Sequence, residues 1–276
     1  MRSRLIYFGM AVGSAITAAA SPLVNLNTAS SFGLLGGTIS NTGTSVIFGD
    51  VGVKDGSGTI TGFNPTGTTV GGSVYSPGAV ASDNAFTDFV SAFDAAQLLS
   101  STQTYADLTL SRTFLGNNVY TFVPTDISTT SGINLTFDAQ NDPNEVFVIR
   151  TDGALTVNGA MTFTLENQAQ ANHIFWIVGT DATVSVGSSG PITFDGSILA
   201  GGSVTVSAAS GGTGVLAGTF NGCLFAGTAN TLAGTTDVNG CGGTTTPEPG
   251  TAGCLGLGAA LGLLVRRKRT VGLNRN

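Results

Sequence analysis

Residues that could carry out acid–base or nucleophilic chemistry are few in this 276-residue sequence. The single histidine, His173, lies in an apolar stretch, where a structural histidine is far more common than a general base. Glu145 and Glu166 are the only glutamates between residues 21 and 245. Several aspartates precede glycine or proline, as in Asp55-Gly56 and Asp142-Pro143, where aspartate caps a turn. The pattern predicts no catalytic residue and no cofactor, and therefore a protein that is not an enzyme.

The cysteines suggest a structural role and not a metal site. Cys223 and Cys241 lie before the C-terminal segment, and Cys254 lies within it. A disulfide between Cys223 and Cys241 would close a loop of about 18 residues and contribute about 3 kcal/mol, whereas two free buried thiols are the alternative. Because neither a Cys-x-x-Cys nor an Asp-x-Asp-x-Asp spacing occurs, we predict no metal site.

The charge of the central region excludes polyanionic partners. Between residues 21 and 245 the only cations are Lys54, Arg112 and Arg150, against 15 acids, which gives a formal charge of 3 − 15 = −12. Phosphate contacts supply most of the affinity for nucleic acid. We therefore predict no nucleic-acid partner.

Threonine, serine and asparagine alternate with apolar residues in short segments, and this is the one repeated polar pattern. Alternation with period two predicts strands with one buried face, so the polar residues point outward. For a single threonine, ordinary β-propensity explains the residue, and only a row in register would be informative. The outward candidates are Thr156, Asn158, Thr183, Ser185, Ser203, Thr205 and Ser207; Asn134 and Thr136 extend the row if Ile133, Leu135 and Phe137 point inward.

These segments belong to a mainly β chain with one helix. Fully apolar pieces at residues 146–149, 174–178, 197–201, 215–218 and 224–227 predict strands buried on both faces. The Leu-Ala-Gly block of 197–201 returns 17 residues later, which suits one turn of a β-solenoid; a β-sandwich or barrel is the alternative. Phenylalanines at helical spacing predict an amphipathic helix over residues 82–99, with Ser82 as N-cap and Phe86, Phe89, Val90, Phe93 and Gln97 on its buried stripe.

Both ends of the chain read as targeting segments. Residues 1–20 carry Arg2 and Arg4, an apolar run and small residues near Ala20, which predicts a secretory signal peptide. Residues 244–276 contain Pro247-Glu248-Pro249, 16 uncharged residues from Gly250 to Val265, and the cations Arg266, Arg267, Lys268 and Arg269. That order resembles the PEP-CTERM sorting signal of Gram-negative bacteria. The resemblance implies an exported protein of the cell surface or matrix, transient membrane anchoring, and processing by exosortase.

Several stretches, in this order, resemble the DUF3494 family of ice-binding proteins. They are residues 32–53 (FGLLGGTISNTGTSVIFGDVGV), 142–150 (DPNEVFVIR), 172–179 (NHIFWIVG), 196–205 (GSILAGGSVT) and 214–222 (GVLAGTFNG). The resemblance runs from about Asn25 to Gly240, within one predicted domain of residues 21–243. It implies an irregular right-handed β-helix of triangular cross-section with one long helix alongside. It also implies adsorption to an ice crystal surface. The alternative is a non-catalytic adhesin of the cell surface or biofilm matrix that binds exopolysaccharide.

Overall fold

The computed structural model describes residues 23–63, 69–123, 126–129, 132–159, 161–185, 192–207 and 216–242. Within these ranges the chain forms parallel β-sheets and one α-helix, α1 (Val80–Gln97). No helix of this part of the chain is long and apolar enough to cross a membrane. The predicted signal peptide and the predicted sorting segment lie outside the described residues.

The two larger sheets each collect strands from along the whole chain. The eight-stranded sheet contains, in spatial order, β4 (Asp50–Val53), β1 (Phe32–Gly36), β21 (Leu224–Ala226), β18 (Ser197–Ala200), β15 (Ile174–Val178), β12 (Phe147–Thr151), β9 (Asn118–Phe122) and β7 (Gln103–Tyr105). The seven-stranded sheet contains β10 (Ile127–Thr129), β13 (Leu155–Asn158), β16 (Ala182–Ser185), β19 (Val204–Ser207), β22 (Ala229–Ala233), β2 (Thr38–Asn41) and β5 (Ile60–Thr61).

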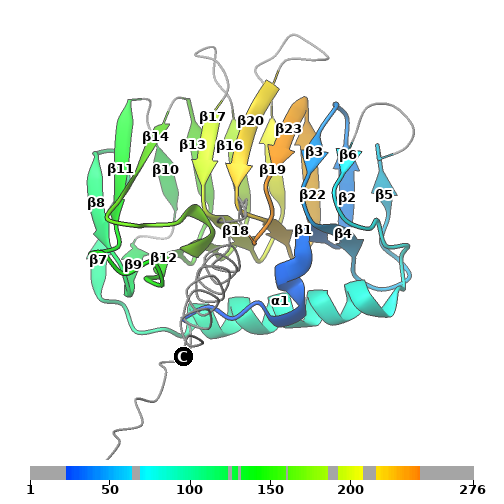
Figure 1. The fold of residues 1–276 in the computed structure, drawn as a ribbon, viewed down its shortest axis with the longest axis horizontal. Helices are drawn as coiled ribbons and strands as arrows, with labels where there is room; N and C mark the ends of the chain where they lie inside the picture. The colour runs from blue at the N-terminus through cyan, green and yellow to red at the C-terminus, as the bar shows by residue number, and fades with distance from the viewer. Residues whose placement is uncertain are drawn as a thin grey trace, which may run out of the picture.

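Two smaller sheets continue one another and make a third wall. The three-stranded sheet contains β14 (Met161–Glu166), β11 (Ile133–Asp138) and β8 (Arg112–Leu115). The five-stranded sheet contains β17 (Ile192–Asp195), β20 (Leu216–Asn221), β23 (Thr235–Val238), β3 (Val46–Ile47) and β6 (Thr69–Val70). They meet where β14 lies beside β17 (Figure 1).

Successive strands visit the three walls in turn, as β12, β13 and β14 do, and one such turn is called a coil below. All strand pairs among the described residues are parallel, which contradicts the antiparallel sandwich or barrel and fits a β-solenoid. The 17-residue repeat is wrong as a coil length. Hydrogen-bonded partners on neighbouring coils are 22 residues apart at Asp181–Ser203 and 29 at Asn117–Val146. Residues 216–218, in β20, also belong to a different wall from residues 197–200, in β18.

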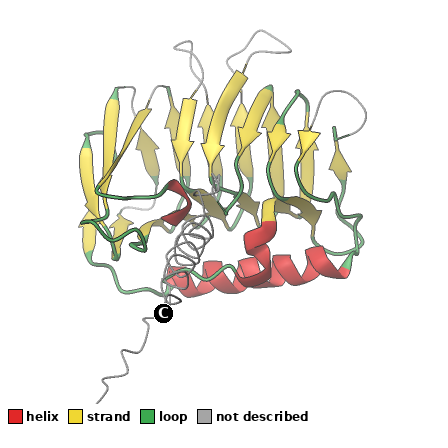
Figure 2. Ribbon diagram, viewed as in Figure 1, coloured by secondary structure: helices red, strands yellow, loops and turns green. Residues whose placement is uncertain are grey.

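The chain is folded back so that its first coils stack on its last. β1–β3 and β4–β6 form one end, α1 then runs along the eight-stranded sheet, and the later coils stack from the far end back to β21 (Figures 1 and 2). β21 pairs with β1, where Leu34 faces Leu224. With 18 residues α1 is about 27 Å long, so it covers most of the roughly 34 Å that seven inter-strand spacings of about 4.8 Å require.

The helix is present, but its start and its buried face differ from the prediction. It begins at Val80 with Ala79 as N-cap, and Ser82 is fully buried inside the first turn, where its hydroxyl donates to the Ala79 carbonyl. The packed face consists of Ser82, Ala85, Phe89, Ala92 and Ala96, whereas Val90 is exposed. Small alanines bring the helix close to the sheet. Phe89 is fully buried between them, and the predicted Phe86 and Phe93 are half-buried and pack against the same cluster.

Apolar layers lie on both sides of the eight-stranded sheet. Between it and α1, Phe89 packs against Phe225 with ring centroids 5.5 Å apart. On the other side, inside the coils, phenylalanines form a continuous file whose neighbouring centroids are 5.1–6.2 Å apart. Phe163 on β14 meets Phe194 on β17 in this file, so the core continues where the third wall is split. The file comprises Phe114, Phe137, Phe163, Phe194 and Phe220.

Aspartates at the coil corners hold neighbouring coils together. Each accepts a backbone N–H from the adjacent coil: Asp181 from Ser203 at 2.7 Å, and Asp126 from Ala154 at 2.9 Å. Asp50 and Asp237 do the same for Ser73 and Val46. A carboxylate that accepts N–H groups satisfies backbone donors that a tight corner leaves unpaired. The excess of acids therefore has a structural use within the coils.

One buried arginine joins α1 to the eight-stranded sheet. The Nη1 of Arg150 on β12 donates to the carbonyl oxygens of Gln97 (2.6 Å) and Leu99 (2.7 Å), and its Nη2 donates to Thr121 Oγ1 at 3.1 Å. The guanidinium thus satisfies carbonyls at the C-terminus of the helix, where the helix dipole favours a positive charge.

We predict that Arg150→Met lowers the free energy of unfolding by about 3 kcal/mol, because buried hydrogen bonds to a charged group are lost and helix carbonyls lose their partner. Urea unfolding measures the change. Arg112→Met is the matched control: Arg112 lies over the Tyr105 ring at 4.1 Å and beside Asp107 at 3.7 Å, and we expect a loss of about 1 kcal/mol or less. Equal stability of Arg150→Met and wild type would contradict the assignment.

A chain of polar side chains at one corner, ending at the buried Asp195, leads to a prediction about how stability depends on pH. Asn239 Nδ2 donates to Asn221 Oδ1 and Asn221 Nδ2 donates to Asp195 Oδ1, both at 2.6 Å. Burial raises the pKa of Asp195, and the hydrogen bond from Asn221 opposes the rise only in part. A carboxyl whose pKa is higher in the folded state disfavours folding once ionised, so this cost is present at neutral pH and disappears as pH falls through the folded pKa.

We therefore expect Asp195→Asn to be more stable than wild type at neutral pH, with the difference shrinking as pH falls below the pKa of the folded carboxyl towards that of the unfolded chain. Urea unfolding at a series of pH values measures this. A variant that is less stable than wild type at neutral pH would show that the ionised carboxylate stabilises the corner.

Candidate functional site

A single row of hydroxyl residues runs along the outer face of the seven-stranded sheet. The pairing register places Thr156 opposite Thr183, Thr183 opposite Thr205, and Thr205 opposite Thr231. The row continues on every remaining strand of the sheet. From end to end it comprises Ser128, Thr156, Thr183, Thr205, Thr231, Ser40 and Thr61.

The outward direction of this row is fixed by the core. On β13, β16 and β19 the strand burial alternates strictly, with Leu155, Val157, Val184 and Val206 fully buried. A shift of one residue would expose these side chains and bury hydroxyls, so the register is strongly specified.

The hydroxyls at the centre of the row make no hydrogen bond within the described part of the protein. Within the described part of the chain, those of Thr156, Thr183, Thr205 and Thr231 have no hydrogen-bond partner, although the residues are only half-exposed. Their neighbours two residues on form a second row, Asn158, Ser185, Ser207 and Ala233. In it Ser185 and Ser207 share a hydrogen bond of 3.1 Å. The first row therefore presents unpaired hydroxyls and methyls to solvent.

The structure brings six of the nine predicted outward residues onto this sheet and places three elsewhere. Thr156, Asn158, Thr183, Ser185, Thr205 and Ser207 lie on it. Ser203 precedes β19, at the corner, and its hydroxyl pairs with that of Thr228 at 2.8 Å. Asn134 and Thr136 lie on β11 of the three-stranded sheet, opposite Thr162 and Thr164, so the prediction that they extend the row is wrong. The expected burial of Ile133, Leu135 and Phe137 is confirmed.

Sequence reasoning missed four members of the row, and broken alternation explains three of them. Next to Thr231, the polar Asn230 points inward and is buried, where an apolar residue would have marked the face. Asn41 beside Ser40 and Thr129 beside Ser128 are likewise buried polar residues. The fourth, Thr61, lies on a two-residue strand, too short to show a period.

The other walls offer no equivalent surface. The outer face of the eight-stranded sheet is covered by α1. The third wall carries two shorter threonine rows, Thr113, Thr136 and Thr164 in the three-stranded sheet and Thr193 and Thr219 in the five-stranded sheet. The Thr164 hydroxyl is bonded to Asn134 Oδ1, and beyond Thr219 the outward positions are Asp237 and Val46. A continuous, uncharged row in register is therefore a feature of the seven-stranded sheet.

The remaining candidate groups lie away from the row. Cys223 and Cys241 form a disulfide with Cα atoms 4.7 Å apart, at the corner between the five- and eight-stranded sheets. Pro247, Glu248, Pro249, Arg266, Arg267, Lys268 and Arg269 lie outside the described residues. His173 ends a short 3-10 turn, η2 (Ala171–His173), before β15. Burial, and then the nearby Asp142, raise the pKa of Glu145.

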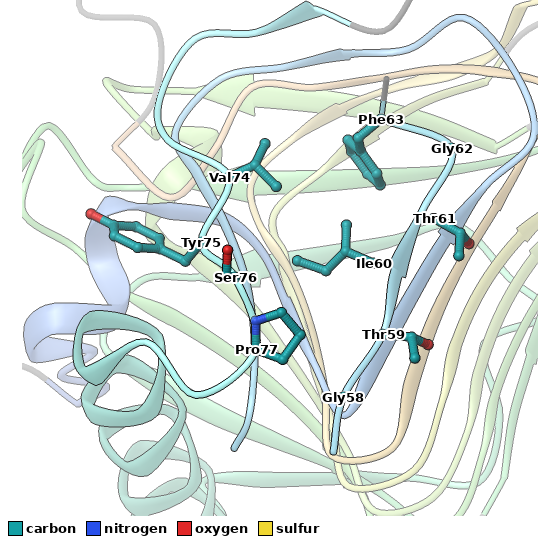
Figure 3. A pocket seen from close by; sticks show the side chains of 10 residues that line it. All are labelled: Gly58, Thr59, Ile60, Thr61, Gly62, Phe63, Val74, Tyr75, Ser76 and Pro77. Atoms are coloured by element: carbon teal, nitrogen blue, oxygen red, sulfur yellow. The ribbon is translucent and has the colours of Figure 1, made fainter. Parts of the chain in front are cut away.

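A cavity of 710 Å³ lies at the end of the solenoid, between residues 58–63 and 74–77 (Figure 3). Ile60, Phe63 and Val74 point into it, whereas the Tyr75 ring turns away and packs on Phe32. The described lining contains no carboxylate, imidazole, thiol or amine. Elsewhere among the described residues, no three His, Cys, Asp or Glu side chains gather in a metal-binding group. The cavity adjoins the apolar core, against which Ile60 and Phe63 pack.

Comparison with known proteins gives one family. A sequence profile described as ice-binding-like matches residues 34–238. An ice-binding protein of Nostoc sp. (strain HG1) is 35% identical over 190 residues, which cover 68% of this chain and 66% of the relative, just under two thirds. The crystal structure of an ice-binding protein from the Antarctic ascomycete Antarctomyces psychrotrophicus superposes with a TM-score of 0.64 at 32% identity, covering 77% of this chain and 96% of that one. An ice-binding protein from an Antarctic biological consortium gives 0.63 at 27% identity, with 82% and 95% covered.

Proposed function

The chain belongs to the ice-binding-like family, and on that premise we propose that it adsorbs to ice through the outer face of its seven-stranded sheet. Adsorbed protein of this kind blocks growth at the crystal surface and so inhibits recrystallisation. The observation that carries the proposal is the seven-residue row of hydroxyl side chains in register from Ser128 to Thr61, whose four central hydroxyls have no partner among the described residues.

The row suits ice because ice offers neither charge nor pocket to a ligand. A binder must instead hold a layer of water in regular positions over a rigid face. Adjacent coils repeat at about 4.8 Å, and alternate residues of one strand at about 6.5–7 Å, so the two rows form a two-dimensional lattice of anchoring points. Threonine supplies a hydroxyl and a methyl group on a side chain with restricted χ1. Water on this face would be ordered before it meets the crystal.

Rigidity under the row comes from the packed core. A closely packed interior resists deformation, so the spacing of the row does not drift under thermal motion. We infer further that the coils wind as an irregular right-handed β-helix of triangular cross-section. In a triangular coil, the corner between two walls lies opposite the third wall.

We propose that residues 21–243 form the mature ice-binding domain, preceded by a cleaved signal peptide and followed by a sorting segment that exosortase processes. Support for export comes from the Cys223–Cys241 disulfide, since disulfides persist in oxidising compartments outside the cytosol. The destination is the cell surface or extracellular matrix of a Gram-negative bacterium, with transient anchoring of the C-terminal segment in a membrane.

We also propose that the protein is not an enzyme. Its buried or bonded carboxylates serve the coils: Asp126 and Asp181 accept backbone N–H groups, and Asp138 accepts from Asn167 and Gln140, bonds that lower the pKa of its carboxyl. Adsorption to ice requires no general acid or base.

We expect Thr183→Tyr to reduce recrystallisation inhibition and thermal hysteresis at least about tenfold, equivalent to about 1.4 kcal/mol of adsorption free energy. A tyrosine at the centre of the row would hold the crystal away from its neighbours. Thr136→Tyr is the matched control, because Thr136 is equally half-exposed on a strand of the third wall. We expect it to leave activity unchanged.

Three outcomes are distinguishable when circular dichroism shows that both variants are folded. Loss confined to Thr183→Tyr supports the seven-stranded sheet. Loss confined to Thr136→Tyr would move the ice-binding face to the third wall. A folded wild type without activity would contradict ice binding and leave the non-catalytic exopolysaccharide adhesin as the function to test.

A further inference from the structure

Three asparagine–glycine pairs lie on strands or at strand ends of the solenoid: 158–159, 221–222 and 239–240. Such a pair can react with itself, because the backbone nitrogen of the glycine lies next to the side-chain amide carbon of the asparagine. Glycine has no Cβ to hinder that approach. Whether a pair reacts in the folded protein therefore depends on how firmly its two residues are held.

Two of the pairs are held firmly. The amide of Asn221 is bonded on both sides: its Nδ2 donates to Asp195 Oδ1 and its Oδ1 accepts from Asn239 Nδ2, both at 2.6 Å. The following glycines lie against backbone, since a Cβ on Gly222 or Gly240 would come within 2.6 Å of a carbonyl oxygen of another coil. These contacts oppose any turn of either amide towards the next backbone nitrogen.

The pair Asn158-Gly159 is held much less firmly. Asn158 is the last residue of β13 and its exposed one, and its side chain has no hydrogen-bond partner among the described residues. The backbone N–H of Gly159 donates to the Ser185 carbonyl oxygen at 3.3 Å, longer than an ordinary N–H···O bond. The nitrogen that would attack and the amide that it would attack are thus both weakly restrained.

We propose that Asn158 is a site of spontaneous deamidation. The Gly159 nitrogen attacks Cγ of Asn158 and forms a new C–N bond. The bond between Cγ and Nδ2 breaks, and Nδ2 leaves as ammonia with the proton from the Gly159 N–H. Water then opens the resulting succinimide ring at either carbonyl, which gives aspartate or isoaspartate. The chain loses ammonia and gains water, so the reaction needs no enzyme and no other reactant.

The product places a charge on an uncharged surface. Asn158 belongs to the second row of the seven-stranded sheet, opposite Ser185 and two residues from Thr156, and neither row contains a charged residue. A carboxylate loses hydration when it is pressed against ice, which costs adsorption free energy. Isoaspartate also lengthens the backbone by one atom at the end of β13 and disturbs the register there. Each molecule therefore loses affinity for ice as it ages, a consequence that rests on the proposed function.

The site is tested by incubating the full chain at mildly alkaline pH, both folded and unfolded in urea, and locating deamidation in chymotryptic peptides by mass spectrometry. In the folded protein we expect Asn158 to react several-fold faster than Asn221 and Asn239. In urea the three should react at similar rates, because only the local sequence then matters. A preference for Asn158 that is no greater in the folded protein than in urea would overturn the proposal.

The consequence for ice binding is tested with Asn158→Asp and with Thr136→Asp, which puts the same charge on the third wall. With both variants folded, we expect several-fold weaker recrystallisation inhibition from Asn158→Asp and no change from Thr136→Asp. Wild type should lose activity in step with its deamidated fraction, whereas Asn158→Gln should keep its own starting activity, since glutamine would have to form a larger ring.

Full activity of Asn158→Asp would overturn the loss of affinity with age. Wild type that is inactive even before incubation would instead contradict the proposed function. The mass measurement still decides the site in that case, because it does not depend on ice.

Discussion

Parallel hydrogen bonding between coils is the constraint on which the rest of this structure depends. Because the coils stack in register, a side chain's direction on one strand is repeated on the next, and a buried row inside the solenoid dictates a solvent-facing row outside it. Leu155, Ala182 and Val204 form such an inner row, and Thr156, Thr183 and Thr205 follow from it. The central threonine row is thus obtained from core packing, without hydrogen bonds among its own hydroxyls.

The same constraint explains the unusual composition. Only 9% of the residues are charged, yet carboxylates recur at the corners, where the ladder of backbone hydrogen bonds is interrupted. There Asp126 and Asp181 accept N–H groups from the neighbouring coil, and Asp237 does so from within β23. These carboxylates lie outside the outward row, which contains no charged residue. Where the first and last coils meet, the buried Asn230 donates to the carbonyls of Leu35 and Leu224 and closes the junction.

Local patterns in the sequence predict the strands and the single helix, but not the order in which the coils stack. The pairing of Leu34 with Leu224 joins residues that lie at opposite ends of the domain, and no periodicity reports such a contact. For a related reason, the sequence does not predict which wall a strand belongs to. Asn134 and Thr136 alternate with apolar residues just as Thr156 and Thr183 do, and only the corner geometry places them on different walls. The helix boundary depends on how closely Ala85 and Ala92 approach the sheet, which is a property of tertiary packing.

The central claim is that ice contacts the seven-stranded sheet and not the third wall. The most direct measurement labels a cysteine introduced at Ser207 with a fluorophore, in a protein whose Cys254 is changed to serine, and a second protein labelled at Thr193. Quenching by a water-soluble quencher is then compared for free and ice-adsorbed protein. Our account predicts that adsorption protects the label at position 207 and leaves the label at position 193 accessible. Protection at position 193 with continued quenching at position 207 would contradict it.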